Sequence, residues 1–286
     1  MAKVVSFINM KGGVGKTTLA VNVAYGLAYY HKQKVLLVDA DPQFNATQYL
    51  LDDQRYLKHI KEERATLSDV FVRRPTRIKT VTTKSDVKSP GKVSLNDAKL
   101  NIFDGGKGRG KLDLIPSTLQ LMEIETSKRG TENKLRRFVC EYAKEYDYVI
   151  IDCPPTISIF TQAAILASNM YLVPIKPDPL SVIGLPLLER WLDEFTDDNG
   201  MSVEPVGLVF TLVRGPLPSR MKEVMEDLRV KRKGQVFATS LSQANCVARS
   251  VESHQPVFLF EKSNKTVGQL QSITAEFLKR TTGVGS

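Results

Sequence analysis

The chain has 286 residues, of which 42% are hydrophobic and 25% charged, and its formal net charge is +9. This composition is ordinary for a globular protein, and no apolar run reaches the roughly 18 residues of a membrane span. The first residues lack the charged, apolar and small-residue sections of a signal peptide. The three cysteines, Cys140, Cys153 and Cys246, are far apart and odd in number, so they imply no disulfide framework or metal pair and fit a reducing cytosol. We therefore expect a cytoplasmic protein that has no membrane-spanning segment.

Strand-like and helix-like patterns alternate from the first residues onward. Apolar runs bounded by glycine, proline or acidic residues predict buried strands, in chain order, at 3–9, 34–41, 147–155, 170–177 and 204–213. Helical patterns lie between and after these runs, at 16–31, 65–72, 117–128, 131–145, 157–168, 180–197 and 264–280. This alternation predicts one doubly wound α/β domain over residues 1–286, with a mostly parallel sheet flanked by helices.

Residues 73–111 interrupt this rhythm and hold most of the positive charge. The segment has eleven Lys and Arg residues against three Asp, a net of +8. We interpret it as an irregular basic insertion that ends in a hairpin between 100–103 and 112–115. A second basic cluster, RVKRKG, spans 229–234. Such an excess favours a polyanionic partner, either nucleic acid or an anionic membrane surface.

The loop after the first strand reads INMKGGVGKTT and nearly matches the phosphate-binding pattern G-x-x-x-x-G-K-[ST]. Gly15, Lys16 and Thr17 fit the last three places, whereas Met10 stands where the first glycine is expected. Glycines let the backbone N–H groups turn toward phosphates, and the helix that follows adds its positive N-terminal end. Lys16 is expected to reach the outer phosphates, and the hydroxyl of Thr17 to bind Mg²⁺.

Acidic residues follow two of the predicted strands at the edge where ligands of such sheets bind. Asp152 ends the run VIIDCPP and is expected to hold Mg²⁺ through a water molecule. Asp39 and Asp41 end the run LLVDAD. Asp39 is expected to support the metal, and Asp41 to orient the attacking water, because phosphoryl transfer requires a residue that positions the nucleophile.

These motifs, KGGVGKTT, VLLVDADPQFNAT and YVIIDCPP, resemble in order and spacing the deviant Walker A ATPases of the ParA/MinD superfamily. Within that group the chain is most similar to ParA-type partition and cargo-positioning ATPases, and the likeness covers nearly the whole chain except about 73–111. The resemblance implies an enzyme that converts ATP and water to ADP and phosphate with Mg²⁺. It also implies that ATP brings two subunits together with both nucleotides between them.

The resemblance assigns roles to individual residues. Lys11 corresponds to the signature lysine, which contacts the phosphates of the partner subunit. Asp41 corresponds to the residue that orients water, and Asn45 is expected near the γ-phosphate. The catalytic set is therefore Lys11, Lys16 and Asp41, and the metal set is Thr17, Asp39 and Asp152. The nucleotide-binding set is Lys11, Gly12, Gly13, Val14, Gly15, Lys16, Thr17 and Thr18.

Relatives of this type bind DNA without sequence preference in the ATP-bound dimer, through basic residues of the C-terminal part. The candidates here are Arg214, Arg220, Lys231, Arg232, Lys233 and Arg249. The chain departs from some relatives at Cys246, where they have arginine, and at His254, where they have glycine. The resemblance further implies association with the nucleoid, segregation of a plasmid or other DNA cargo, and a ParB-like adaptor. Adaptor and DNA are expected to stimulate an ATPase that is weak alone.

Two alternatives to this hypothesis stay open. One is a MinD-like ATPase that acts on a membrane surface, although the final residues FLKRTTGVGS have no apolar face. The other is a scaffold that binds nucleotide without hydrolysing it. Iron–sulfur relatives need paired cysteines, which this chain lacks. Sequence-specific operator binding is not expected, because no N-terminal extension precedes the first strand. The insertion 73–111 fits a DNA-contacting arm, a partner-binding element or a disordered loop equally well.

Overall fold

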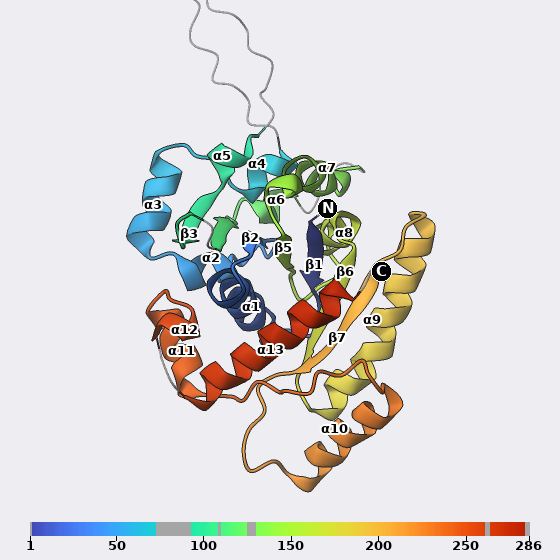
Figure 1. The fold of residues 1–286 in the computed structure, drawn as a ribbon. Helices are drawn as coiled ribbons and strands as arrows, with labels where there is room; N and C mark the ends of the chain where they lie inside the picture. The colour runs from blue at the N-terminus through green and yellow to red at the C-terminus, as the bar shows by residue number, and fades with distance from the viewer. Residues whose placement is uncertain (1, 73–92, 108–109, 125–129, 261–263, 284–286) are drawn as a thin grey trace, which may run out of the picture.

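A computed structural model describes residues 2–72, 93–107, 110–124, 130–260 and 264–283 (Figure 1). Their centre is a seven-stranded sheet in the order β3-β4-β2-β5-β1-β6-β7. The strands are β1 Lys3–Phe7, β2 Lys34–Asp39, β3 Leu100–Asp104, β4 Lys111–Ile115, β5 Tyr148–Asp152, β6 Met170–Ile175 and β7 Glu204–Phe210. All neighbours pair in parallel except β3 and β4, which form the antiparallel hairpin at one edge. The prediction of a mostly parallel α/β sheet is therefore confirmed.

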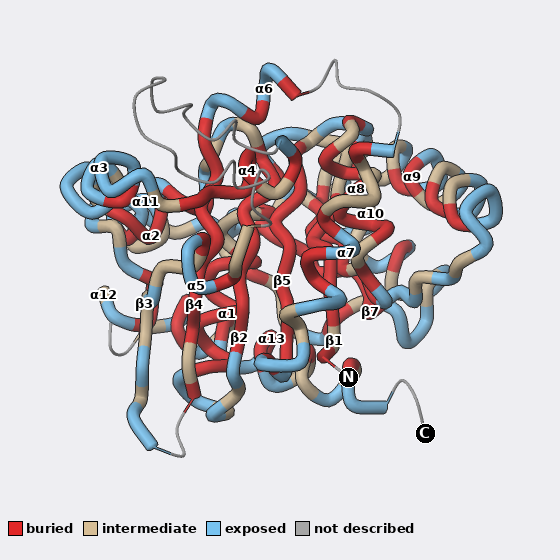
Figure 2. The backbone as a smooth tube through the Cα atoms, turned by 90° about the horizontal axis from the view of Figure 1, so that it is seen from above, coloured by how far each residue is buried: buried red, intermediate tan, exposed pale blue. Residues whose placement is uncertain are grey.

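Helices cover both faces of this sheet because its central strands are apolar on both sides, as buried parallel strands are. All five residues of β5 are buried, and Figure 2 shows the central strands as a buried layer. The helices on one face are α1 Lys16–His31, α2 Asn45–Leu50, α12 Val257–Phe260 and α13 Lys265–Thr282. Those on the other face are α4 Leu67–Phe71, α5 Leu95–Ala98, α6 Leu121–Ile124, α7 Asn133–Tyr142 and α8 Ile159–Ala167.

Two further helices, α9 Pro179–Asp198 and α10 Ser219–Lys231, pack beside β6 and β7. The remaining helices, α3 Asp53–Lys61 and α11 Asn245–Glu252, lie at the periphery on the side of α2 (Figure 2). A short 3₁₀ turn, Ala143–Glu145, follows α7. Within the described ranges no helix is both long and apolar enough to span a bilayer.

The helix predicted at 16–31 is confirmed as α1, in which every residue from Leu19 to Ala28 is buried between the sheet, α2 and α13. The structure corrects the element predictions in two respects. The helix predicted at 117–128 is helical only over Leu121–Ile124 among its described residues, since the chain turns at 117–120. Six helices, α2, α3, α5, α10, α11 and α12, were not predicted at all. The predicted hairpin is confirmed, whereas residues 73–92 of the basic insertion lie outside the described residues.

Candidate nucleotide-binding site

The order of the strands brings three chain segments together at the carboxyl edge of the sheet. β5 lies between β1 and β2, so Asp152 pairs in register with Phe7 on one side and with Asp39 on the other. The glycine loop leaves β1 at this edge and enters α1 at Lys16. Residues more than 100 positions apart in the sequence therefore surround one cavity of about 420 Å³.

The glycine loop has the backbone geometry that phosphate binding requires. Gly13 and Gly15 adopt φ of +68° and +78°, in the left-handed region that favours glycine. Gly15 caps α1 without a side-chain bond, and the first turn of the helix has no acidic residue. The positive N-terminal end of α1 is therefore open to an anion. Thr211 at the end of β7 steadies the loop, because its hydroxyl donates a 2.6 Å hydrogen bond to the carbonyl of Val14.

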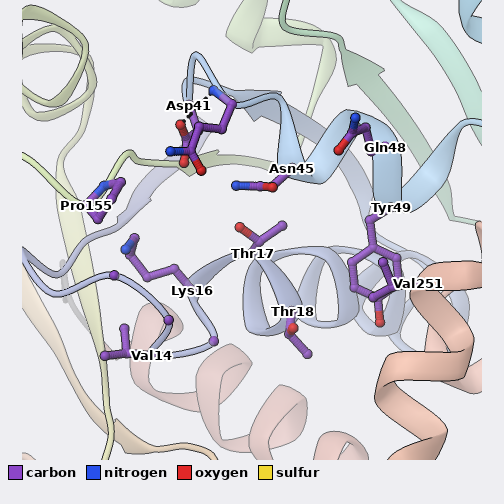
Figure 3. Close-up of a pocket in the computed structure, with 14 residues that line it drawn as sticks. Val14, Lys16, Thr17, Thr18, Asp41, Asn45, Gln48, Tyr49, Pro155 and Val251 are labelled. Carbon is purple, nitrogen blue, oxygen red and sulfur yellow. Dashed lines mark hydrogen bonds between the residues drawn. The ribbon is translucent and has the colours of Figure 1, made fainter.

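The cavity runs from the glycine loop to helices α2 and α11. Its walls are Gly12, Gly13, Val14, Gly15, Lys16, Thr17, Thr18, Asp41, Gln43, Asn45, Gln48, Tyr49, Pro155 and Val251. Figure 3 shows Lys16 and Pro155 at one end and Tyr49 and Val251 at the other. Asn45 and Thr17 face each other between the two ends.

Lys16 is 7% exposed, and its ammonium donates a 3.3 Å hydrogen bond to the carbonyl of Lys11. Burial lowers the pKa of Lys16, while the carboxylates of Asp152 and Asp41 act in the opposite direction. The side chain is thus a buried cation beside two acids, with donor capacity left for an anionic ligand.

Asp152 is fully buried, and neither of its carboxylate oxygens has a hydrogen-bond partner of ordinary geometry. Burial raises the pKa of Asp152 to about 7, although the Thr17 hydroxyl and Lys16 both lie near enough to lower it. Unpaired buried carboxylates are costly unless a cation or a polar ligand satisfies them. The orphaned oxygens beside a threonine hydroxyl therefore fit a hydrated Mg²⁺ ion.

Protein oxygens alone do not form a complete cage here. Among the described residues there is no cluster of three or more His, Cys, Asp and Glu side chains positioned to hold a metal ion. Mg²⁺ typically takes only one or two protein ligands and completes its shell with waters and substrate phosphates. The donor set of Thr17 and Asp152 fits that pattern.

Asp39 and Asp41 have different surroundings, although they are two residues apart. The carboxylate of Asp39 accepts hydrogen bonds from the amide of Thr47 at 2.8 Å and from its hydroxyl at 2.7 Å. Burial, together with nearby Asp152, raises the pKa of Asp39 well above its usual value. Asp39 lies outside the cavity lining and holds α2 to the end of β2, so its place at a metal stays a prediction.

Asp41 lies beyond the end of β2 and lines the cavity directly. Its carboxylate accepts a 2.9 Å hydrogen bond from the amide of Gln43, and its carbonyl accepts one from the hydroxyl of Ser117 at 2.8 Å. These contacts fix the loop, and Asp41 lies on the wall of the cavity across from Lys16 and Thr17 (Figure 3).

Lys11 does not line the cavity of its own chain. Its ammonium contacts both carboxylate oxygens of Asp178, at 2.7 and 2.9 Å, and the hydroxyl of Ser181 at 3.2 Å. Asp178 is also the N-cap of α9, where it accepts a 2.9 Å bond from the amide of Ser181. Burial raises the pKa of Asp178, but the hydrogen bonds from Lys11 and Ser181 outweigh this effect and lower it.

The sequence predicted the loop, Thr18, Asp41 and Asn45, all of which line the cavity. It missed Gln43, Gln48, Tyr49, Pro155 and Val251. Pro155 follows the Asp152 motif closely enough to have been included. Gln43 lies two residues after Asp41, and the other three come from α2 and α11, two short helices that were not predicted.

The candidate DNA contacts lie on two helices and the adjoining segments. Arg214, Arg220, Lys231, Lys233 and Arg249 are exposed. Arg249 stacks over the ring of Phe260 at 5.0 Å, and Arg214 donates to the side chain of Gln243. Arg232 is half-buried in an ion pair with Glu189 of α9, so it is the least accessible of the six.

A strand, a glycine loop and a helix N-terminus around a cavity of this kind define a P-loop NTPase. A family model described as AAA domain, AAA_31, matches residues 2–204. The virulence plasmid ParA family protein pGP5-D of Chlamydia psittaci is 26% identical over 282 residues, 96% of this chain and 93% of that protein. The sporulation initiation inhibitor protein Soj of Bacillus subtilis is 27% identical over 272 residues, 93% of this chain and 94% of Soj.

Solved structures agree on the fold. A plasmid partition protein from Borrelia burgdorferi, bound to AMPPNP, matches with a TM-score of 0.73 at 22% identity, over 98% of this chain and all of that one. The chain therefore belongs to the AAA_31 family and is a ParA-type ATPase of the deviant Walker A class.

Proposed function

We propose that this protein hydrolyses ATP in a nucleotide-sandwich dimer, binds DNA non-specifically in that state, and leaves the DNA after hydrolysis. A ParB-like adaptor on a plasmid or other cargo would stimulate hydrolysis and so move the cargo. The observation that carries the proposal is that two lysines of one loop lie in different places. Lys16 is buried in the cavity of its own chain, whereas Lys11 is held outside it by Asp178.

The residues of one chain supply most of the hydrolytic site. The loop amides and Lys16 would bind the phosphates, and Thr17 and Asp152 would hold Mg²⁺. The metal, when bound, neutralises charge on the phosphate oxygens. Asp41, fixed by Gln43 and Ser117, would orient the attacking water.

Lys11 would complete the site of a second copy. Its ammonium lies beside the N-terminus of α9, where Leu180, Ile183 and Leu187 are 72%, 65% and 62% exposed. These residues have the i, i+3, i+7 spacing of one helical face, and a second copy is the occupant that the proposal requires there. In the dimer, Lys11 would exchange Asp178 for the partner's phosphates and act like an arginine finger.

Basic residues of α10 and α11 support contact with the DNA backbone. Five of the six candidates are exposed, and contacts of this kind are independent of sequence and steeply dependent on salt. The names of the ParA-family relatives support a role in partition.

Co-sedimentation with DNA and with anionic liposomes, each with ATP and with ADP, tests this proposal against the membrane alternative. We expect ATP-dependent sedimentation with DNA and none with liposomes. Binding to liposomes without binding to DNA would favour a MinD-like activity instead.

Phosphate release tests the proposal against a scaffold that does not hydrolyse ATP. We expect Asp41→Ala to bind ATP and to release phosphate about 10²-fold more slowly than the native chain, with DNA and adaptor present. Equal rates would remove Asp41 from the mechanism.

A further inference from the structure

The end of the cavity opposite Lys16 is formed by helices α2 and α11 (Figure 3). Gln48 and Tyr49 of α2 and Val251 of α11 line this end. A bound nucleotide that fills the cavity would therefore touch both helices. The attachment of α11 to the rest of the protein decides what such contact does.

Helix α11 is attached through hydrogen bonds and through Val247, a partly buried side chain that packs against the core. Its one buried residue is Ser250, which is polar. The Ser250 hydroxyl is 2.7 Å from the hydroxyl of Tyr49, and the ring of His254, just beyond α11, is 2.7 Å from the carbonyl of Gln48. Because a helix with one partly buried apolar side chain is held weakly by packing, we expect these two hydrogen bonds to α2 to contribute to its position.

The hydrogen bonds around Tyr49 have only one arrangement of donors and acceptors. The side-chain amide of Asn22 in α1 donates to Tyr49, at 3.1 Å, and to the carbonyl of Thr18, at 2.8 Å. The hydroxyl of Ser250 donates to the carbonyl of Val247 at 2.8 Å, so it must accept from Tyr49. Protons thus run from Asn22 to Tyr49 to Ser250, and such chains strengthen cooperatively in a buried setting.

The other end of α2 is tied to the catalytic edge. Thr47 bonds to Asp39, and the amide of Phe44 donates to the carbonyl of Asp41 at 2.8 Å. Because α2 has only six residues, we expect it to move as one unit. A change at Asp41 would therefore reach Tyr49 and, through it, Ser250.

We propose that the Tyr49–Ser250 hydrogen bond couples occupancy of the nucleotide cavity to the position of α11. Helix α11 carries Arg249, which is exposed over Phe260. The bond would therefore make the affinity of this surface for a polyanion, the phosphate backbone of duplex DNA, depend on nucleotide. Tyr49 and Ser250 are positioning residues in this scheme, and the link to DNA rests on the proposed function.

Hydrogen–deuterium exchange of peptides covering 245–252, with and without saturating ATP, measures the coupling directly. In the native chain we expect ATP to slow exchange at least about fivefold, within the usual range of coupling between sites. In Ser250→Ala the effect should fall below about twofold. Tyr49→Phe, which keeps Ser250, should lose the effect as well.

Ser168→Ala is the matched control. Ser168 is also buried, bonds to the hydroxyl of Ser6 at 2.8 Å, and donates to a carbonyl four residues earlier, but it lies at the end of α8. It should retain the full effect of ATP on 245–252. No effect of ATP in the native chain, or an undiminished effect in Ser250→Ala, would overturn the inference.

A DNA titration at saturating ATP separates this inference from the proposed function. Ser250→Ala should bind duplex DNA about five- to tenfold more weakly than Ser168→Ala. If the native chain binds no DNA while ATP still protects 245–252 in a Ser250-dependent manner, the proposed DNA function fails and the coupling stands.

Discussion

At the scale of single residues, Lys16 and Lys11 belong to one loop but have different surroundings, so replacing each should impair a different step. We expect Lys16→Ala to weaken ATP binding about 10²-fold or more, because the buried ammonium is the main side-chain cation of the cavity. Lys11→Ala should bind ATP within a few-fold of the native chain and hydrolyse it about 10³-fold more slowly. Titration with a fluorescent ATP analogue and single-turnover phosphate release measure the two effects. If Lys11→Ala abolished binding as Lys16→Ala does, the two lysines would share one task.

We expect the buried carboxylate of Asp152, which is proposed to hold Mg²⁺, to lower the stability of the nucleotide-free protein. The pKa of Asp152 is about 7 in the folded protein, against 3.8 for an aspartate side chain that is not buried. The folded state therefore binds more protons than the unfolded state between these values, and stability falls as the pH rises from about 4 to 7. Lys16, Thr17, Asp39 and Asp41 surround the group, and the charge of Asp152 in turn raises the pKa of Lys16 and of Asp39.

Asp152→Asn removes this titration. Without nucleotide or Mg²⁺, we expect the variant to melt about 5 °C above the native chain at pH 8 and close to it at pH 5. It should at the same time lose Mg²⁺-dependent hydrolysis. Scanning calorimetry at the two pH values provides the measurement. A lower melting temperature at pH 8 would mean that the buried carboxylate is satisfied in a way the structure does not contain.

The residues of the phosphate loop could be predicted because their chemistry depends on a short run of sequence. Gly13 and Gly15 need left-handed backbone, and Lys16 and Thr17 follow at once. The contact of Lys11 with Asp178 could not be predicted, because it joins positions 167 residues apart. Tyr49 was missed for a similar reason, since only the fold reveals that Ser250 lies against it.

At the scale of elements, the strands were predictable and several helices were not. Strands such as β5 are continuous apolar runs, which buried parallel strands require. Helix α10 has apolar residues at helical spacing, Met221, Val224, Met225 and Leu228, but buries only Leu228 among them, and the eight-residue α11 buries only Ser250; both were overlooked in a stretch rich in charged and polar residues. Helix α2 starts after Phe44, whose φ of +45° is unusual for such a side chain.

Helix α10 should contact DNA through the exposed lysines at and beyond its C-terminus. We expect Lys231→Ala with Lys233→Ala to weaken ATP-dependent DNA binding and to reduce the slope of log affinity against log salt by about 2, one for each lost phosphate contact. The control is Lys32→Asn with Lys34→Ala, which removes two exposed lysines at the start of β2, a strand separated from β7 by β5, β1 and β6. Fluorescence anisotropy over a range of salt concentrations measures both. Equal slopes in the two variants would exclude this end of α10 from the DNA surface.

At the scale of the whole molecule, the fold follows from strand order. β5 lies between β1 and β2, so three motifs scattered over about half of the chain converge at one edge. The sequence predicted the convergence from the general rule for such sheets. It did not predict that α11, which begins about 230 residues after the phosphate loop, would help to form the end of the cavity opposite Lys16.

The central claim is that Lys11 acts on the nucleotide of a second copy. Lys11→Ala and Asp41→Ala should each be nearly inactive alone. In a heterodimer of the two, the Lys11→Ala subunit keeps its own Asp41 and receives Lys11 from its partner, so one of the two sites is complete. Phosphate release from an equimolar mixture measures this directly. Random pairing predicts recovery of about a quarter of the native rate. A mixture that stays as inactive as either variant alone would contradict the account, because Lys11 would then act within its own chain.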